Sequence, residues 1–105
     1  MKILLVCSGG MSSAIVVKAI EKEAVKNGIN VEVKSVGSGE FAEEVKNGWD
    51  IALVAPQVRH RVNSFQEAAA EYGVPVSVIP PQGYSPLGGG MILAHVKKVL
   101  GRSEE

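Results

Sequence analysis

Residues Lys2 to Ser13, KILLVCSGGMSS, predict a buried strand, a tight turn and the start of a helix. The apolar run 3–6 has no polar face, as in a central strand that helices cover on both sides. The chain's single cysteine, Cys7, ends this run, and a helical pattern begins near residues 11–13. A helix N-terminus carries unpaired N–H groups and partial positive charge, which favour a thiolate or a bound phosphate. We therefore take Cys7 as the candidate reactive residue and the rest of the chain as its scaffold.

The remaining chain alternates predicted strands with predicted helices. The strands are expected at 2–6, 31–36, 51–55 and 74–79. The helices are expected from near 11–13 to about 27 and at 40–47, 63–72 and 90–100, before a frayed tail at 102–105. The uniformly apolar strand 51–55 fits a central position, whereas the alternation in 31–36 and Pro75 in 74–79 fit sheet edges. This pattern predicts one α/β domain, residues 1–105, with a four-stranded parallel sheet of order 2-1-3-4 and helices on both faces.

Apolar residues at helical spacing are expected to face the sheet. These inward-facing residues are Val17, Ile20 and Ala24 in the first helix, Phe65, Ala68, Ala69 and Tyr72 in the third, and Met91, Ile92, Val96 and Val99 in the last.

The predicted strand order puts a switch point between the first and third strands, where such sheets bind ligands at the carboxyl ends of strands. Three loops are expected there, at 7–13, 56–61 and 80–90. The second loop contributes Pro56, Gln57 and Val58, and the third contributes Tyr84, as candidate neighbours of Cys7.

The loop after Cys7 suits a phosphoryl group held by backbone N–H groups. Its candidate phosphate-binding residues are Ser8, Gly9, Gly10, Met11, Ser12 and Ser13. The glycines permit close backbone approach, and the serines offer hydroxyl donors. Because the loop has no Lys or Arg, it suits a carrier that passes the group on better than a hydrolase. The alternative is a buried cysteine that acts as a small apolar residue beside a turn.

Other cysteine chemistries fit less well. A small tyrosine phosphatase uses C-x5-R, but Ser13 stands at the arginine position, and Asp50 precedes a strand rather than following one. A dithiol needs a second cysteine. A Cys–His hydrolase would need His60, which lies in the right loop, or His95, which the last helix places on its surface or in its packing.

Composition excludes several broad classes. The net charge of +0 gives no overall basic field for nucleic acid. No apolar run approaches the roughly 20 residues that span a bilayer, and MKILLVCSGG is too short and lacks the cleavage site of a signal peptide. No spacing suggests a metal site or a cofactor, and the expected compartment is the cytoplasm.

Arg59 and Arg61 are candidates for docking an acidic partner near Cys7.

Three features together match a known family over essentially the whole chain. They are KILLVCSGGMSS, the segment DIALVAPQV at 50–58, and the loop that contains Pro80. With this length, the chain resembles the IIB component of the lactose/cellobiose-type phosphoenolpyruvate-dependent sugar phosphotransferase system. The family often has glycine before the proline of the second segment, where this chain has Ala55.

The resemblance implies a phosphotransferase component without a cofactor. Cys7 would accept a phosphoryl group from phosphohistidine of the IIA protein. It would then pass the group to a β-glucoside-type disaccharide, such as cellobiose, held by the membrane protein IIC. A monomer that docks transiently is expected. The competing hypotheses are a redox-sensing thiol and a docking domain in which Cys7 is never phosphorylated.

Overall fold

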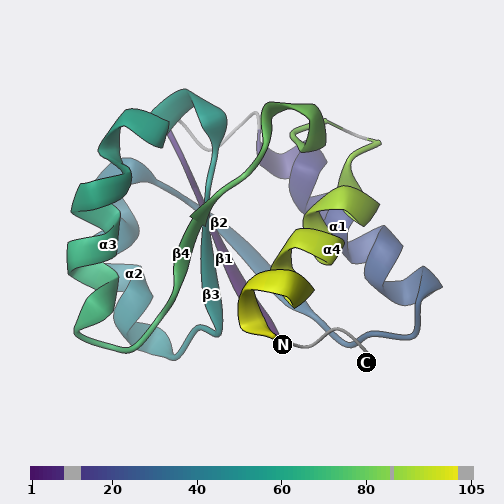
Figure 1. The fold of residues 1–105 in the computed structure, drawn as a ribbon, viewed down its shortest axis with the longest axis horizontal. Coiled ribbons are helices and arrows are strands. Elements are labelled where there is room, and N and C mark those ends of the chain that lie inside the picture. Colours follow the sequence, from purple (N-terminus) through teal and green to yellow (C-terminus); the bar gives the residue numbers. More distant parts are fainter. Residues whose placement is uncertain (9–12, 86, 102–105) are drawn as a thin grey trace.

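The computed structural model describes residues 1–8, 13–85 and 87–101, which form a four-stranded parallel sheet between two layers of helices (Figure 1). The strands are β1 (Lys2–Cys7), β2 (Glu32–Gly37), β3 (Ile51–Val54) and β4 (Val76–Val78). The helices are α1 (Ser13–Lys26), α2 (Phe41–Glu44), α3 (Val62–Ala70) and α4 (Gly89–Leu100). The order β2-β1-β3-β4 confirms the predicted sheet. Among the described helices, none is long and apolar enough to cross a bilayer.

Each face of the sheet has its own core. Leu4 and Val6 of β1 pack beneath α2 and α3, whereas Ile3 and Leu5 pack beneath α1 and α4 (Figure 1). All four side chains are 0% exposed. Because alternate residues point to opposite faces, a central strand must be apolar throughout. Burying each such side chain contributes roughly 1.5–3 kcal/mol, and β1, like the equally buried β3, links the two cores.

The edge strands are less buried. Residues of β2 alternate between exposed and half-buried up to Val36, as the sequence predicted. The observed β4 is shorter than the predicted strand 74–79. Pro75 precedes it and takes part in the sheet through its carbonyl, which accepts a hydrogen bond from the N–H of Ala52. Pro80 follows shortly after, and a proline has no N–H to extend the ladder.

The predicted helix 40–47 is wrong in detail. The segment consists of a 3-10 turn η1 (Ser38–Glu40), the short helix α2 and a second 3-10 turn η2 (Val45–Asn47). The indole Nε1 of Trp49 donates a hydrogen bond to the Glu44 carbonyl at 3.0 Å. That carbonyl is an acceptor that a longer α-helix would use itself. Gly48, with φ of 88°, then ends the segment.

Several predictions about helix faces were also wrong. Tyr72, Met91 and Val99 are 47%, 47% and 39% exposed. Tyr72 lies beyond the end of α3, so helical spacing does not apply to it. In α4, Leu93 is buried together with the correctly predicted Ile92 and Val96, so the buried face is rotated toward Leu93.

The glycine-rich start of α4 lies directly against α1. A Cβ atom added to Gly89 would be 2.3 Å from the carbonyl oxygen of Ala19, closer than real Cβ contacts come. The same addition at Gly90 would meet only the Glu23 side chain, at 3.4 Å. Gly89 therefore permits the close approach of the two helices.

An ion pair between β2 and α2 gives a pH-dependent contribution to stability. The Lys34 Nζ atom lies 3.0 Å from Glu44 Oε1, and this hydrogen bond lowers the pKa of Glu44 below its ordinary value of 4.5. Because the folded-state pKa is depressed, the stabilisation is present above pH 4.5 and is lost as the pH falls through the folded-state pKa.

Glu44→Gln is therefore expected to lower the free energy of unfolding by about 0.5 kcal/mol near neutral pH, a typical value for an exposed pair. The difference from the wild type should shrink in acid, as the pH falls through the folded-state pKa of Glu44 and its carboxylate becomes neutral like the glutamine side chain. Urea unfolding near neutral pH and in acid measures it. An equal difference at both pH values would contradict the role of the Glu44 charge.

Candidate functional site

The carboxyl ends of β1, β3 and β4 meet at one edge of the sheet. Val6 is in register with Val54, and Val54 with Val78. The segments that follow these strands therefore leave the sheet side by side. They bring Cys7, the turn that begins at Pro56, and the segment leading to Tyr84 to the same edge, as the sequence predicted.

Cys7 is the last residue of β1 and pairs in register with Gly37 at the end of β2. It is 1% exposed and belongs to the core cluster beneath α2 and α3. The next residue, Ser8, is exposed and lies in a bend. The cysteine therefore stands at the predicted place, but it is covered, and an incoming group reaches it only after a local movement.

Four candidate phosphate-binding residues, Gly9, Gly10, Met11 and Ser12, lie outside the described residues. Helix α1 begins at Ser13, in agreement with the predicted helix start. Its N-terminal N–H groups and positive dipole end therefore follow Cys7 within a few residues of chain. This arrangement can stabilise negative charge near the end of β1.

The predicted polar loop after β3 is a 3-10 turn, η3 (Pro56–Arg61), with Pro56 in its first position. The N–H of Ala55 donates a hydrogen bond to the Val6 carbonyl at 2.9 Å, which places the start of η3 beside Cys7. Val58 is 3% exposed and belongs to the same core cluster as Cys7. Gln57 is exposed. Val58 therefore anchors the turn in the core, while its polar residues stay at the surface.

Tyr84 follows the 3-10 turn η4 (Pro81–Gly83), which leads from β4 to α4. The N–H of Ile79 donates to the Val54 carbonyl and carries the β3–β4 pairing one residue beyond β4. Tyr84 is half-buried and packs against both core clusters. It thus closes the carboxyl edge of the sheet between the two helical layers.

One contact at this edge has no counterpart in the sequence pattern. The Arg61 Nη1 atom donates a hydrogen bond to Ser38 Oγ at 3.1 Å. The guanidinium group also lies over the ring of Phe65, with Cζ 5.6 Å from the ring centroid. Phe65 in turn packs against Phe41, with ring centroids 4.9 Å apart. Ser38 and Phe41 lie far in the chain from Arg61 and Phe65, so no local motif predicts the contacts between these two pairs of residues.

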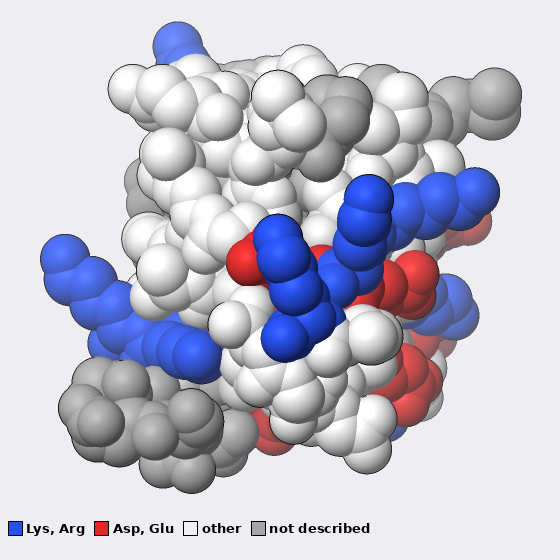
Figure 2. All heavy atoms as spheres, turned by 90° about the vertical axis from the view of Figure 1, so that its right-hand side faces the viewer, with Lys and Arg blue, Asp and Glu red and all other residues white. Residues whose placement is uncertain are grey.

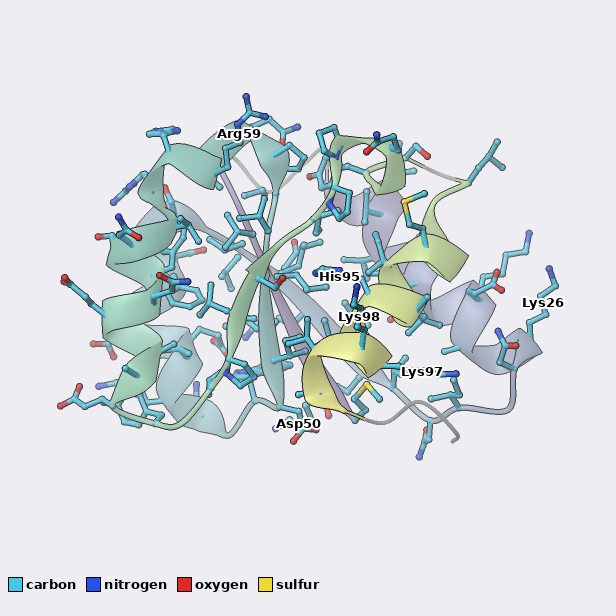
Figure 3. All side chains as sticks on the ribbon, viewed as in Figure 1. Lys26, Asp50, Arg59, His95, Lys97 and Lys98 are labelled. Carbon is cyan, nitrogen blue, oxygen red and sulfur yellow. The ribbon has the colours of Figure 1, made fainter. Side chains whose placement is uncertain are left out.

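The two histidines have different environments. His60 is exposed on η3, at the edge that carries Cys7. His95 lies midway along α4, away from Arg59 and the strand ends (Figure 3). Its Nε2 atom is 2.6 Å from Ser77 Oγ of β4. His95 therefore connects α4 to the edge strand β4 through a side-chain hydrogen bond. Separately, the described residues contain no cluster of three His, Cys, Asp or Glu side chains that could hold a metal.

Comparison with known sequences gives one consistent result. The profile of the family described as "PTS system, Lactose/Cellobiose specific IIB subunit" matches residues 2–93. The oligo-beta-mannoside-specific EIIB component of Bacillus subtilis (strain 168) is 32% identical over 83 residues, which cover 79% of this chain and 80% of that protein. The galactose-specific EIIB component of Lactococcus lactis subsp. cremoris (strain MG1363) is 28% identical over 102 residues, covering 93% and 94%.

Solved structures agree with the sequence comparison. The lactose-specific IIB component domain from Streptococcus pneumoniae superimposes with a TM-score of 0.76 at 25% identity, covering 90% of this chain and 96% of that one. The cellobiose-specific phosphotransferase IIB component protein from Borrelia burgdorferi gives 0.75 at 30% identity, covering 98% and 94%. The similarity therefore extends over nearly the whole fold, including the edge that carries Cys7.

Proposed function

Since the chain belongs to the lactose/cellobiose-specific IIB family of the sugar phosphotransferase system, we propose that it is a phosphoryl carrier and that Cys7 is the residue phosphorylated. The observation that supports this assignment is the position of Cys7. It ends the central strand β1 at the switch point of the sheet, and the N-terminus of α1 follows shortly after. Backbone N–H groups at such a place favour both the thiolate and the phosphoryl oxygens.

The proposed reaction consists of two in-line transfers. The Cys7 thiolate attacks the phosphorus of a phosphohistidine on the IIA protein, so that an S–P bond forms while the N–P bond breaks and the imidazole leaves with the electron pair. The oxygen of a sugar hydroxyl held by the membrane protein IIC then attacks the same phosphorus. An O–P bond forms while the S–P bond breaks, Cys7 leaves as the thiolate, and the hydroxyl proton is released to solvent. The residues around Cys7 position the group and stabilise its equatorial oxygens.

The burial of Cys7 adds a step to this scheme. With 1% of the residue exposed, an in-line approach to sulfur requires a local opening at the end of β1. Once modified, the sulfur carries a charge of about −1.5 to −2, by analogy with other phosphorylated residues, which the core beneath α2 and α3 cannot accommodate. We propose that the phosphorylated side chain turns outward, toward the start of α1.

The proposed partners are the IIA protein as donor and membrane IIC with its bound sugar as acceptor, with this domain on the cytoplasmic side. The relatives are described as oligo-beta-mannoside-, galactose- and cellobiose-specific. Cellobiose is a β-linked glucose disaccharide, and we propose a β-glucoside-type disaccharide as the acceptor.

A redox sensor is the second candidate, because the chain has one cysteine, Cys7, whose thiol can in principle be oxidised. Sensor cysteines are usually accessible to solvent, whereas Cys7 is buried. Under mild oxidant, we therefore expect the folded protein to form sulfenate or mixed disulfide slowly. Rapid oxidation of Cys7 in the native state would favour the sensor.

The carrier function is tested by intact mass after incubation with phosphoenolpyruvate, the general phosphotransferase proteins and a IIA protein. The wild type is expected to gain one phosphoryl group, and Cys7→Ser is expected to gain none under the same conditions. If the wild type gains none from a IIA that phosphorylates another IIB protein of the family, the carrier proposal fails.

A further inference from the structure

We propose that Arg59, His60 and Arg61, named here the η3 basic surface, form the docking site for the donor protein, whose phosphohistidine carries an anionic phosphoryl group. This proposal rests on the carrier function, and it assigns one of the two partners to a particular part of the site. All three residues are exposed on the part of η3 that follows its kink at Val58.

The η3 basic surface lies beside the reactive cysteine. Its turn begins where the N–H of Ala55 bonds to the Val6 carbonyl, one residue before Cys7. Val58, inside the turn, shares a core cluster with Cys7. Figure 3 shows Arg59 above the carboxyl edge of the sheet, with its side chain pointing away from the molecule. A partner that contacts this turn therefore reaches the edge where Cys7 lies.

Arg61 spans the end of β1. It belongs to the turn after β3, but it donates its hydrogen bond to Ser38, which directly follows β2. Because β1 lies between β2 and β3, this contact bridges the two strands that flank Cys7. The guanidinium group of Arg61 also packs over the Phe65 ring, with Cζ 5.6 Å from the ring centroid, and this contact restricts the side chain further. A side chain that is already held in place loses less conformational entropy when it binds a partner.

No ion pair within the described residues neutralises the positive charge of this surface. The turn PQVRHR contains no acidic residue. Among the described residues, the two ion pairs are Lys34–Glu44 and Lys46–Glu43, and neither reaches η3. Glu40 on the adjacent turn η1 accepts a hydrogen bond from the N–H of Gly37 and is not paired with an arginine. The surface therefore attracts anions.

Charge complementarity identifies the donor as the occupant. A phosphohistidine brings an anionic phosphoryl group, and acidic groups around it would increase the attraction. The membrane acceptor fits less well, because cytoplasmic loops of membrane proteins carry an excess of Lys and Arg. A basic surface would repel such loops. Opposite charges also speed encounter between proteins, which suits a carrier that docks briefly.

A matched control exists on another part of the molecule. The lysines of α1 and α4 lie on the side face formed by these helices, interspersed with acidic side chains (Figure 2). Lys26 and Lys98 are both exposed there, away from Arg59 and the carboxyl edge (Figure 3). Lys26→Gln/Lys98→Gln therefore removes the same charge as Arg59→Gln/Arg61→Gln, at a place that the proposal does not involve.

The test measures the second-order rate constant of phosphoryl transfer from phosphorylated IIA protein to Cys7 by rapid quench. At about 50 mM salt, the double arginine variant is expected to react roughly 5- to 20-fold more slowly than the wild type. The lysine control should stay within about twofold. The arginine effect should disappear at about 500 mM salt, and the final extent of phosphorylation should be unchanged. Equal rate constants for the two double variants would overturn the proposal.

Two further measurements separate the possible failures. Arg59→Gln alone leaves the Ser38 and Phe65 contacts of Arg61 intact, so a rate loss of several-fold in this variant reflects charge rather than folding. If the wild type takes up no phosphoryl group, the carrier function fails. Calorimetric binding of unphosphorylated IIA to the wild type and the double arginine variant then tests docking. Equal affinities, or a loss confined to the transfer step from Cys7 to sugar, would contradict a donor-docking role.

Discussion

Replacing Cys7 by serine is expected to reduce sugar phosphorylation by at least about 10³-fold in membranes that contain IIC and its sugar, supplied with phosphoenolpyruvate and the upstream proteins. The serine hydroxyl is similar in size to the thiol but is a far weaker nucleophile near neutral pH. Initial rates of sugar phosphate formation measure the effect.

The control for folding is Cys7→Ala. Cys7 is buried among apolar side chains, so serine places an extra polar group in the core, at a cost of roughly 1–3 kcal/mol, whereas alanine does not. Both variants should lose activity although only the serine variant loses this much stability. Residual activity above about one tenth of the wild type in either variant would show that another residue carries the phosphoryl group.

Gly89→Ala is expected to lower the free energy of unfolding by about 2–4 kcal/mol, because its Cβ would lie 2.3 Å from the backbone oxygen of Ala19. Backbone cannot move aside like a side chain, so α4 must shift relative to α1. Buried residues of α4 such as Ile92 would then lose contacts with the core. Urea unfolding of the purified variants measures the loss.

Gly90→Ala is the matched control. Its added Cβ would meet only the Glu23 side chain, at 3.4 Å. Alanine has a higher helix propensity than glycine, so this variant is expected to be as stable as the wild type or up to about 1 kcal/mol more stable. Similar losses in both variants would contradict a specific role of Gly89 in the contact between α1 and α4.

The sheet could be predicted from local sequence because the hydrophobic pattern of each strand shows how far that strand is buried. The apolar run 3–6 and the apolar strand at 51–54 fix the two central positions, and the alternation of β2 fixes an edge. Once strand order is known, the carboxyl edge and the place of Cys7 follow from topology alone.

The features that the sequence did not reveal depend on contacts between distant residues. Arg61 meets Ser38 across 23 positions, and nothing in either segment predicts the other. Glycine is required at position 89 because the Ala19 carbonyl of α1 lies against it, a contact between residues that are far apart in the sequence. The small side chain of Ala19 on α1 was a hint in the sequence that the two helices approach closely. The 3-10 turns could not be predicted from the sequence because they are too short to show a hydrophobic period.

The burial of Cys7 also lay beyond sequence patterns. A cysteine at a strand end can face solvent or the core, and its apolar neighbours on α2 and η3 determine which. This burial connects the fold to the proposed mechanism. A buried thiol is protected from oxidants in solution. In the proposed mechanism, the local opening at the end of β1 that exposes Cys7 can be coupled to docking of the donor at the η3 basic surface.

The central claim is that Cys7 carries the phosphoryl group, and its most direct test is to identify the phosphorylated atom by ³¹P NMR. The protein is first incubated with phosphoenolpyruvate, the general phosphotransferase proteins and a catalytic amount of IIA protein. The account predicts one resonance characteristic of a phosphorus–sulfur bond, assigned to Cys7 by its absence from Cys7→Ala. A phosphorus–nitrogen resonance, lost in His60→Gln or His95→Gln, would contradict it. So would the absence of any protein-bound resonance when the same mixture phosphorylates another IIB protein of the family.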